Sequence, residues 1–377
     1  MRPLLAYCEQ HLADTVETIE TLVRLESPST DKDAVDRCGR ELIARLRAAG
    51  VDVETLSQTD RGDHIRARIA GSGRPVMILG HFDTVWPVGT LERMPLRREG
   101  DHLHGPGTFD MKAGIAMAIT AIAALRSTST PHSPITMLWT TDEEIGSGTS
   151  RATIESEACH AAAVLVLEPA LPSGALKTAR KGCGEFELTV HGKAAHAGVD
   201  PGKGASAIHE LAAQIAAIEG LQDLPRGVSV NVGLISGGSR PNVVAEEARA
   251  VIDVRAPTRE AADAVAAAIR RLQPHRPGTR LTIRGGFERP PMERTEGGVH
   301  LFRLASDVAA SFGYELGEGA TGGGSDGNFT SALGIPTLDG LGPIGDGAHA
   351  EHEHVDVGSL PWRCALVAGL IASLASA

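Results

Sequence analysis

The sequence lacks a cysteine framework, an excess of positive charge and a long uncharged apolar run. Asp and Glu outnumber Lys and Arg by 47 to 36, so the average surface should repel nucleic acid and anionic lipid. No apolar run approaches 18 residues without a charge, so we expect no transmembrane span. The five cysteines are odd in number, form no CxxC pair and suit buried free thiols better than disulfides or a thiolate metal site: Cys8, Cys38, Cys159, Cys183 and Cys364.

The composition is that of an ordinary globular protein. Of the 377 residues, 42% are hydrophobic and 22% are charged, and this length suggests two or three domains. The first 29 residues reach acidic and polar positions before any apolar core typical of a secretory signal. We therefore expect a cytoplasmic enzyme that binds neither nucleic acid nor membrane.

The first 175 residues alternate between helical and strand patterns. Short apolar strands separated by helices indicate a mixed, mostly parallel sheet covered by helices on both faces. In such sheets ligands bind at the carboxyl ends of the strands. The predicted helices span 12–25, 33–49 and 112–126, and the predicted strands span 51–56, 64–70, 75–80, 135–140 and 162–168.

A different pattern begins near Arg180. Apolar residues then alternate at Phe186, Leu188 and Val190, as expected of a sheet covered on one side only. The order strand, helix, strand, strand, helix, strand over 181–291 predicts a ferredoxin-like βαββαβ domain that is inserted into the main domain as a lid. The main domain, 1–180 and 292–377, then resumes with helices near 299–312 and 360–374.

Candidate metal ligands follow the predicted strands. His81 and Asp83 come directly after one strand, and this spacing lets the carboxylate hold the ring nitrogen that does not face a metal. An isolated His-x-Asp can equally lie in a surface loop. Asp110 lies in the tight turn GPGTFDMKAG just before a helix, so its carboxylate either points into the same crevice or caps the helix.

The segment TTDEEIGS places three carboxylates directly after another strand. Because adjacent side chains of an extended segment point in opposite directions, Glu143 and Glu144 should have different roles. One can bind a metal while the other takes a proton from a water molecule that the cation activates. An exposed acidic turn is the alternative interpretation.

Two further groups complete the candidate site. Glu168 ends the apolar run AAVLVLE, and GAHAEHEHV offers three histidines, of which His352 and His354 are expected to be bystanders. One histidine and several carboxylates at successive strand ends indicate a metal site. The oxygen and imidazole ligands, without thiolate, suit Zn²⁺, with Co²⁺ or Mn²⁺ as substitutes.

The motifs together resemble the aminoacylase and glutamate carboxypeptidase family of di-zinc metallopeptidases, and within it the bacterial carboxypeptidase G group. The matching segments occur in family order along nearly the whole chain: GHFDTVWPVGTL, GPGTFDMKAG, TDEEIGS, LEPA, GKAAHAG, GGGSDGNF and GAHAEHEHV. The resemblance implies a phosphorylase/hydrolase-like catalytic domain that carries two Zn²⁺ ions per subunit. It also implies a cis peptide bond after Asp110.

The resemblance implies a role for each candidate. His81, Asp110 and Glu168 would hold one ion. Asp110, Glu144 and His349 would hold the other, with Asp110 bridging. His349 is chosen because the family's ligand histidine is followed four residues later by an acidic residue, here Glu353, and two further on by an aliphatic one, here Val355. Glu143 would be the general base and Asp83 the partner of His81.

The inserted domain would contribute further residues. His196 in GKAAHAG resembles the histidine that reaches the partner subunit's active site, where it stabilises an oxyanion, so a homodimer is expected. The substrate-binding candidates Asn242, Arg255 and Arg289 could equally be a solvated face or a structural ion pair. Backbone N–H groups of 322–325, including Gly323 and Gly324, could hold a substrate carboxylate or only form a turn.

These observations favour hydrolysis of the amide bond to a C-terminal amino acid with a free carboxylate, in a small peptide or N-acyl amino acid. The alternative within enzymes is an N-acyl-amino-acid deacylase of the acetylornithine or succinyl-diaminopimelate type. A catalytically silent metal- or peptide-binding protein would lack a ligand or base, and none is missing. A nucleotide-dependent enzyme is disfavoured because TGGGSDG has no following Lys-Ser/Thr and opens no early βαβ unit.

Overall fold

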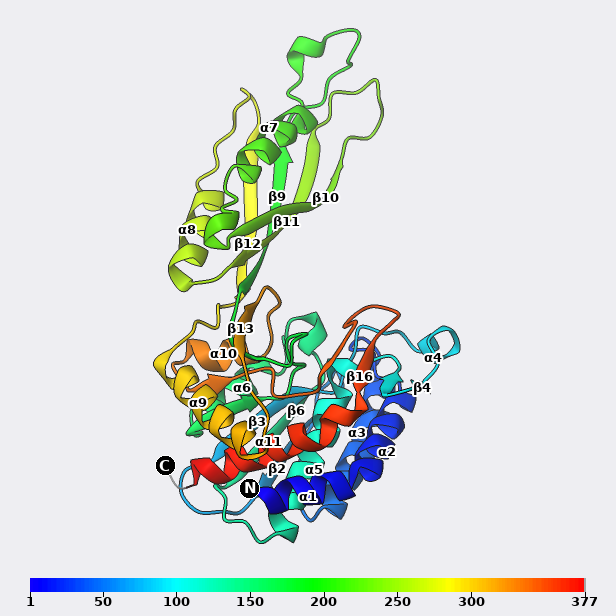
Figure 1. Ribbon diagram of the computed structural model, residues 1–377. Coiled ribbons are helices and arrows are strands. Elements are labelled where there is room, and N and C mark those ends of the chain that lie inside the picture. The colour runs from blue at the N-terminus through cyan, green and yellow to red at the C-terminus, as the bar shows by residue number, and fades with distance from the viewer. Residues whose placement is uncertain (376–377) are drawn as a thin grey trace. The chain divides into compact units, whose positions relative to one another are not determined.

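The computed structural model describes residues 1–375, which form two compact units. The α/β unit comprises Met1–Ala179, Arg294–Thr321 and the chain from Ser325 onward. The second unit, here called the insert, comprises Arg180–Glu293 together with Gly322–Gly324. The chain therefore leaves the α/β unit after Ala179 and returns to it at Arg294 (Figure 1).

The α/β unit is built on a six-stranded sheet in the spatial order β1-β2-β6-β3-β7-β14. The neighbours β6, β3, β7 and β14 run parallel, whereas β2 is antiparallel to both β1 and β6. This confirms the mixed, mostly parallel sheet that the sequence predicts. The strands are β1 (Asp52–Leu56), β2 (His64–Ile69), β3 (Val76–His81), β6 (Ile135–Thr140), β7 (Ala163–Val166) and β14 (Thr337–Leu338).

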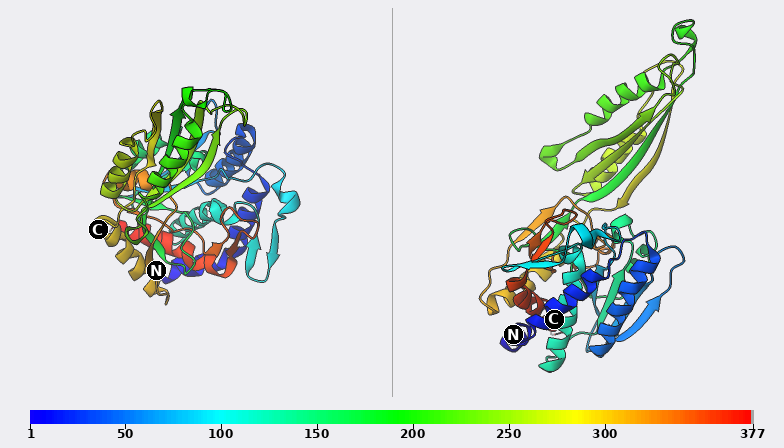
Figure 2. Two further views of the ribbon diagram at one scale, coloured as in Figure 1. Left: turned by 90° about the horizontal axis from the view of Figure 1, so that it is seen from above. Right: turned by 90° about the vertical axis from the view of Figure 1, so that its right-hand side faces the viewer.

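Helices cover both faces of this sheet (Figures 1 and 2). Val76 and Ile78 pack into the core on one face, and Met77 and Leu79 pack into a second core on the other. Because strand β3 is buried on both faces, its sequence is a continuous apolar run. The first core includes α1 (Arg2–Gln10), α2 (Leu12–Arg24), α3 (Lys32–Ala48), α5 (Ala113–Ser127), α9 (Glu296–Ser311) and α11 (Leu360–Leu374); the second includes α6 (Arg151–Ala158) and α10 (Gly327–Ala332).

Within residues 1–375, two helical stretches are long and apolar enough to cross a membrane by length and composition alone. They are Thr108–Ser127, with mean hydropathy 1.4, and Val357–Leu374, with mean hydropathy 1.5. In the structure 83% and 72% of the two apolar windows are buried, and α5 and α11 share one core. Their apolar surfaces are therefore used for packing inside the α/β unit.

A smaller antiparallel sheet of four short strands lies in the same unit. Its order is β15-β16-β5-β4, with β4 (Arg97–Glu99), β5 (His102–His104), β15 (Gly345–Asp346) and β16 (His354–Asp356). This sheet joins the segment before Asp110 to the segment after His349. Another two-stranded sheet pairs β8 (Leu176–Arg180) with β13 (Glu318–Thr321).

The insert has the ferredoxin-like arrangement that the alternating pattern predicts. Its antiparallel strands lie in the order β10-β11-β9-β12, and Phe186, Leu188 and Ile252 pack against its helices in a separate core. Both helices lie on one face of the sheet (Figure 1). The elements are β9 (Gly182–His191), α7 (Ala207–Glu219), β10 (Ser229–Gly237), β11 (Glu247–Ala256), α8 (Arg259–Arg270) and β12 (Arg280–Arg289).

Candidate metal centre

The ends of three neighbouring parallel strands carry the polar residues of the site. β3 ends at His81, β6 leads into Glu143 and Glu144, and β7 leads into Glu168. Because the carboxyl ends of parallel neighbours meet at one edge of the sheet, side chains distant in sequence come together there. The apolar strands thus position a polar cluster at the boundary of the core.

His81 is the centre of the first half of this cluster. Its Nε2 atom lies 3.2 Å from Asp110 Oδ1 and 3.3 Å from Glu168 Oε1. The imidazole is 1% exposed, which removes water as an alternative partner. His81, Asp110 and Glu168, assigned to one ion in the sequence analysis, are therefore adjacent in the structure.

His349 forms the second half. Its Nε2 atom lies 3.4 Å from Asp110 Oδ2 and 3.1 Å from Glu144 Oε2. Asp110 consequently presents one carboxylate oxygen to each histidine, which is the arrangement of a bridging ligand between two cations. The Asp110–Met111 peptide bond is cis, as the resemblance implied.

The charges of this cluster fit divalent cations. Hydrogen bonds to Asp110 and Glu144 raise the pKa of His349 to about 11. Burial raises the pKa of Glu144, and its Oε1 atom is buried without a hydrogen-bond partner among the described residues. Burial lowers the pKa of His81, but hydrogen bonds to Asp110, Asp83 and Glu168 outweigh it and hold that pKa well above its usual value. Closely spaced buried carboxylates thus demand positive charge, which metal ions at these atoms would supply.

Asp83 supports both His81 and the loop after β6. The Nδ1 atom of His81 lies 3.0 Å from the backbone oxygen of Asp83 and 3.4 Å from its carboxylate. The same carboxylate accepts hydrogen bonds from the backbone N–H groups of Glu143 and Glu144 and, at 2.6 Å, from the Ser29 hydroxyl. Asp83 therefore contacts both the His81 ring and the loop after β6, and the nearest acceptor for the ring is the backbone carbonyl of Asp83.

Glu143 lies beside the first half of the cluster. One of its oxygens, His81 and Glu168 have ligand atoms within 4.8 Å of one another, as do His81, Asp110 and Glu144. This proximity suits either a base next to the metal or a ligand. Asp142, the third carboxylate of the run, instead turns away and accepts from the N–H and hydroxyl of Thr149 at 2.6 and 2.7 Å.

Glu353 is a site residue whose contacts the sequence analysis did not foresee. Its fully buried carboxylate accepts from the backbone N–H groups of Gly107, Phe109 and Asp110 at 2.9–3.1 Å. The Trp86 ring N–H donates to it at 2.8 Å. Glu353 thus fixes the turn that presents Asp110. The motif spacing used to choose His349 contained this residue, but gave no hint of its partners.

The insert carries His196 on an exposed turn. Its Nδ1 atom accepts hydrogen bonds from the backbone N–H groups of Gly198 and Val199 at 3.1 and 3.2 Å. Because Nδ1 is the acceptor, a neutral ring carries its proton on Nε2, which can donate to another molecule. Asn242 is adjacent, since its backbone oxygen accepts from the N–H of Ala197 at 3.0 Å.

The other candidates of the insert have different surroundings. Arg255 forms an ion pair of 2.8 Å with Asp253, so the structural ion pair left open by the sequence is present. Arg289 is only 6% exposed. The backbone oxygens of Gly323 and Gly324 accept from Arg180 at 3.2 Å, whereas Ser325 N–H donates to the Asn328 side chain.

Comparison with known proteins identifies the family. The model of "Peptidase family M20/M25/M40" matches residues 77–373. The chain is 31% identical over 368 residues to carboxypeptidase G2 of Pseudomonas sp. (strain RS-16), covering 95% of this chain and 89% of the relative. It is also 31% identical to a putative succinyl-diaminopimelate desuccinylase of Mycobacterium tuberculosis, and this match covers 92% of this chain and 95% of the relative.

A solved structure supports the fold over nearly the whole chain. Aminopeptidase PepT from Bacillus cereus ATCC 10987 superposes with a TM-score of 0.81 at 23% identity, covering 97% of this chain and 99% of that one. The region matched by the family model, residues 77–373, contains every residue of the candidate metal centre. The chain therefore belongs to peptidase family M20/M25/M40 and is a hydrolase of amide bonds.

Proposed function

We propose that the protein is a di-zinc carboxypeptidase that cleaves the amide bond to a C-terminal amino acid with a free carboxylate. The observation that carries this proposal is the division of Asp110 between two histidines. Oδ1 faces His81 and Oδ2 faces His349, and each histidine has a glutamate of its own. Two divalent ions held there would polarise the scissile carbonyl and lower the pKa of water.

Glu143 is proposed as the general base. Its position beside His81 and Glu168 lets it take a proton from water and return the proton to the leaving nitrogen. Glu144, whose Oε2 lies 3.1 Å from His349, is proposed as a ligand instead. His196 is proposed to donate a hydrogen bond from its Nε2–H group to the oxyanion of the tetrahedral intermediate.

Recognition of the substrate carboxylate is assigned to the insert. Arg289 can offer two parallel N–H donors, and the backbone at Gly323 and Gly324 can offer N–H groups to the same anion. Asn242, adjacent to the His196 turn, is proposed to contact the substrate amide. Arg255 is a weaker candidate because Asp253 already engages it.

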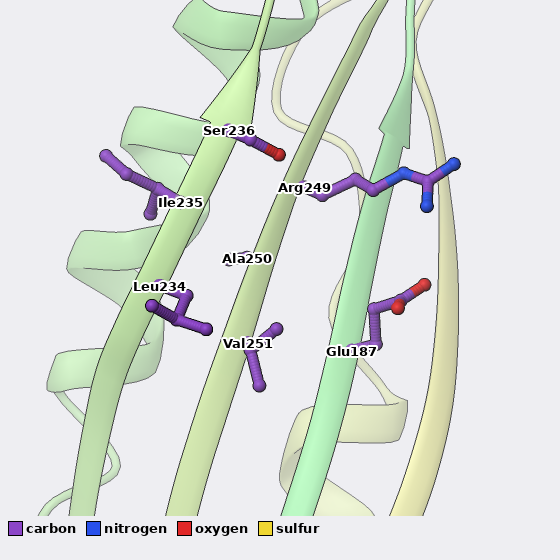
Figure 3. Close-up of a pocket in the computed structure, with 7 residues that line it drawn as sticks. All are labelled: Glu187, Leu234, Ile235, Ser236, Arg249, Ala250 and Val251. Carbon is purple, nitrogen blue, oxygen red and sulfur yellow. The ribbon is translucent and has the colours of Figure 1, made fainter.

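A homodimer formed through the insert is part of the proposal. β10 is an edge strand, and its Leu234 and Ile235 are 68% and 67% exposed. With Val251 and Glu187 they line a hollow of about 320 Å³ on the sheet (Figure 3). An exposed apolar edge strand is costly in water unless another chain covers it. A second copy would bring two such edges together and could present His196 to its partner's metal centre.

Deacylation of an N-acyl amino acid is the second candidate. The relative named as a putative succinyl-diaminopimelate desuccinylase has the same identity to this chain as carboxypeptidase G2, 31%, over 364 residues. The chemistry would be the same, and only the groups on either side of the amide bond differ. The cytoplasmic location expected from the sequence is a further proposal.

Amino-acid release tests the proposal and separates the two candidates. The zinc-loaded protein is incubated with N-acyl glutamates, dipeptides, and N-acetyl and N-succinyl diamino acids. We expect release of a C-terminal amino acid that bears a free carboxylate. Glu143→Gln should abolish release while metal content stays unchanged, and Glu155→Gln, which alters a carboxylate of α6 outside the centre, should leave both unchanged.

Three outcomes would change the assignment. Preferential cleavage of the N-succinyl or N-acetyl diamino acids would favour the deacylase. Loss of metal in Glu143→Gln would make Glu143 a ligand. Absence of release from every compound by the metal-loaded protein would contradict hydrolysis of these classes and favour a binding function.

A further inference from the structure

A second cluster of histidines lies on the small sheet of the α/β unit. In its strands β5 and β16, Leu103 and Val355 point into the core and are 1% and 0% exposed. Because side chains alternate along a strand, the residues on either side of them share the opposite face. That face carries His102, His104, His354 and Asp356.

Three of these side chains are close enough to bind one ion. The Nδ1 atom of His102 lies 2.8 Å from Asp356 Oδ1, and the rings of His102 and His354 are 4.6 Å apart between centroids. One ligand atom from each of His102, His354 and Asp356 lies within 4.8 Å of the others. None of these atoms belongs to the Asp110 centre.

Hydrogen bonding can prepare His354 for metal binding. Its Nδ1 atom lies 2.9 Å from the backbone oxygen of His352, so in the neutral ring Nδ1–H donates to that oxygen. The lone pair is then on Nε2, which lies 4.0 Å from Asp356 Oδ1. A backbone carbonyl that holds the second ring nitrogen is a common support of metal-binding histidines.

We propose that His102, His354 and Asp356 form a third divalent-metal site, separate from the Asp110 centre, that takes Zn²⁺ or a similar transition-metal ion. Two imidazoles and a carboxylate are ligands that Zn²⁺ prefers. Ligand atoms that bind Zn²⁺ tetrahedrally at about 2.0–2.1 Å lie about 3.3 Å from one another. The ligand atoms of the three side chains lie within 4.8 Å of one another, so side-chain shifts of about 1 Å would bring them to this spacing. His102 is 49% exposed and has room for such a movement.

The surroundings favour a cation. Glu99 on β4 and Asp346 on β15 add carboxylates beside the three ligands, and the guanidinium of Arg97 on β4 is paired with Glu99 at 2.6 Å. The fourth position is open to water or to His104. The Nδ1 atom of His104 is buried without a hydrogen-bond partner among the described residues, and its ring lies 5.0 Å from that of His354.

The ion would act as a clamp between β5 and β16. β5 ends six residues before Asp110, and His354 follows His349 by five residues. Cross-linking these strands would restrain both segments that supply ligands to the Asp110 centre. The role assigned to the ion is therefore structural, and the histidine regarded as a bystander in the sequence, His354, becomes a ligand.

Metal stoichiometry tests the third site without reference to activity. Chelator-treated full-length protein is titrated with ZnCl₂ by isothermal calorimetry, and bound zinc is counted by mass spectrometry of the intact protein. We expect wild type to bind one equivalent more than His102→Ala and one more than Asp356→Asn. The test compares the zinc bound by wild type with the zinc bound by each variant. Its result therefore does not depend on whether the Asp110 centre holds two ions.

A matched surface histidine controls for adventitious binding. His160→Ala removes an exposed imidazole at the end of α6 and should retain the full wild-type stoichiometry. Equal zinc content in wild type, His102→Ala and Asp356→Asn, each shown to be folded by circular dichroism, would overturn the proposal. Loss of one equivalent in His160→Ala as well would also overturn it, because binding would then be general to surface histidines.

Discussion

At the residue scale, the turn that presents Asp110 depends on one carboxylate. Glu353 accepts three backbone N–H groups of the 107–110 segment and is fully buried. A carboxylate so placed orients a metal ligand without touching the metal, and the loss of such a support commonly costs 10–100-fold in metal affinity.

Glu353→Gln should therefore weaken zinc binding at the Asp110 centre by about 10–100-fold, because an amide group replaces an acceptor oxygen with a donor. Competition with a chromophoric chelator measures the affinity. Glu351→Gln, two residues away and 78% exposed, is the matched control and should leave it unchanged. Equal affinity in Glu353→Gln and wild type would show that the turn holds its shape without this carboxylate.

The residue types in the sequence predicted most of the candidate metal ligands but not Glu353, which holds the turn that presents Asp110. His81, Glu144 and Glu168 follow apolar strands, so the sheet rule predicts their convergence. Glu353 could not be found in this way because its partners are backbone N–H groups more than 240 residues away. The proximity of His354 to His102 was likewise not predictable, since His102 lies on a strand far away in sequence.

At the element scale, the approach of α5 to the end of β7 leaves no space for a side chain. A Cβ atom on Gly114 would lie 2.3 Å from the backbone oxygen of Leu167, the residue before Glu168. A backbone oxygen cannot rotate away as a side chain can. The close helix–strand contact therefore sets the position of Glu168 relative to Asp110.

Gly114→Ala should destabilise the protein by about 1–3 kcal/mol, the range for overpacking a core. It should also weaken zinc binding, since Glu168 moves with the strand end. Urea unfolding and zinc titration measure the two effects. Gly148→Ala is the control, because a Cβ there meets no atom within 4 Å. Similar unfolding midpoints for Gly114→Ala and Gly148→Ala would contradict the packing argument.

Helices α2 and α3 are joined by an ion pair with a predictable pH dependence. Both terminal guanidinium nitrogens of Arg45 donate to Glu17, at 2.7 and 2.9 Å, and this hydrogen bonding lowers the pKa of Glu17 to about 2. A carboxyl group whose pKa falls on folding stabilises the native state above its unfolded pKa and loses that effect as pH falls. The pH window runs from the ordinary glutamate pKa of 4.5 down to about 2, the pKa of Glu17 in the folded protein.

Glu17→Gln should cost about 0.5 kcal/mol at pH 7, since the carboxylate is 62% exposed and surface pairs contribute little. The difference from wild type should shrink as pH falls below 4.5. Chemical unfolding at pH 7 and at several pH values between 4.5 and 2 checks this. A difference that grows on acidification would have the wrong sign for this linkage.

The longer elements were predictable and the short ones were not. The strands of the insert alternate over ten residues in β9, β11 and β12, which gives a clear period of two. Strands β4, β5 and β16 have three residues each, too few for a period to be visible. They form because the two chain segments next to Asp110 and His349 are brought together by tertiary packing.

At the scale of the whole molecule, we propose that His196 of one subunit acts at the metal centre of its partner. Light scattering should then find a dimer, and Glu143→Gln and His196→Ala should each be nearly inactive alone. When the two variants are mixed in equal amounts and re-associated, half of the dimers are hybrids. Each hybrid has one complete site, which combines Glu143 of one subunit with His196 of the other, so the mixture should recover about a quarter of wild-type activity.

Leu234→Glu provides the control for this experiment, since a charge on the exposed face of β10 should favour monomers. Absence of recovery in hybrids shown to have formed would mean that His196 does not act in the partner's site. A monomeric, fully active wild type would contradict the dimer itself.

The most direct test of the central claim is reversible metal removal. Protein treated with chelator and freed of it should release no amino acid from a substrate that the zinc-loaded form cleaves, and added ZnCl₂ should restore the rate in wild type but not in Glu143→Gln. Full activity in protein shown to contain no metal would contradict catalysis at the Asp110 centre.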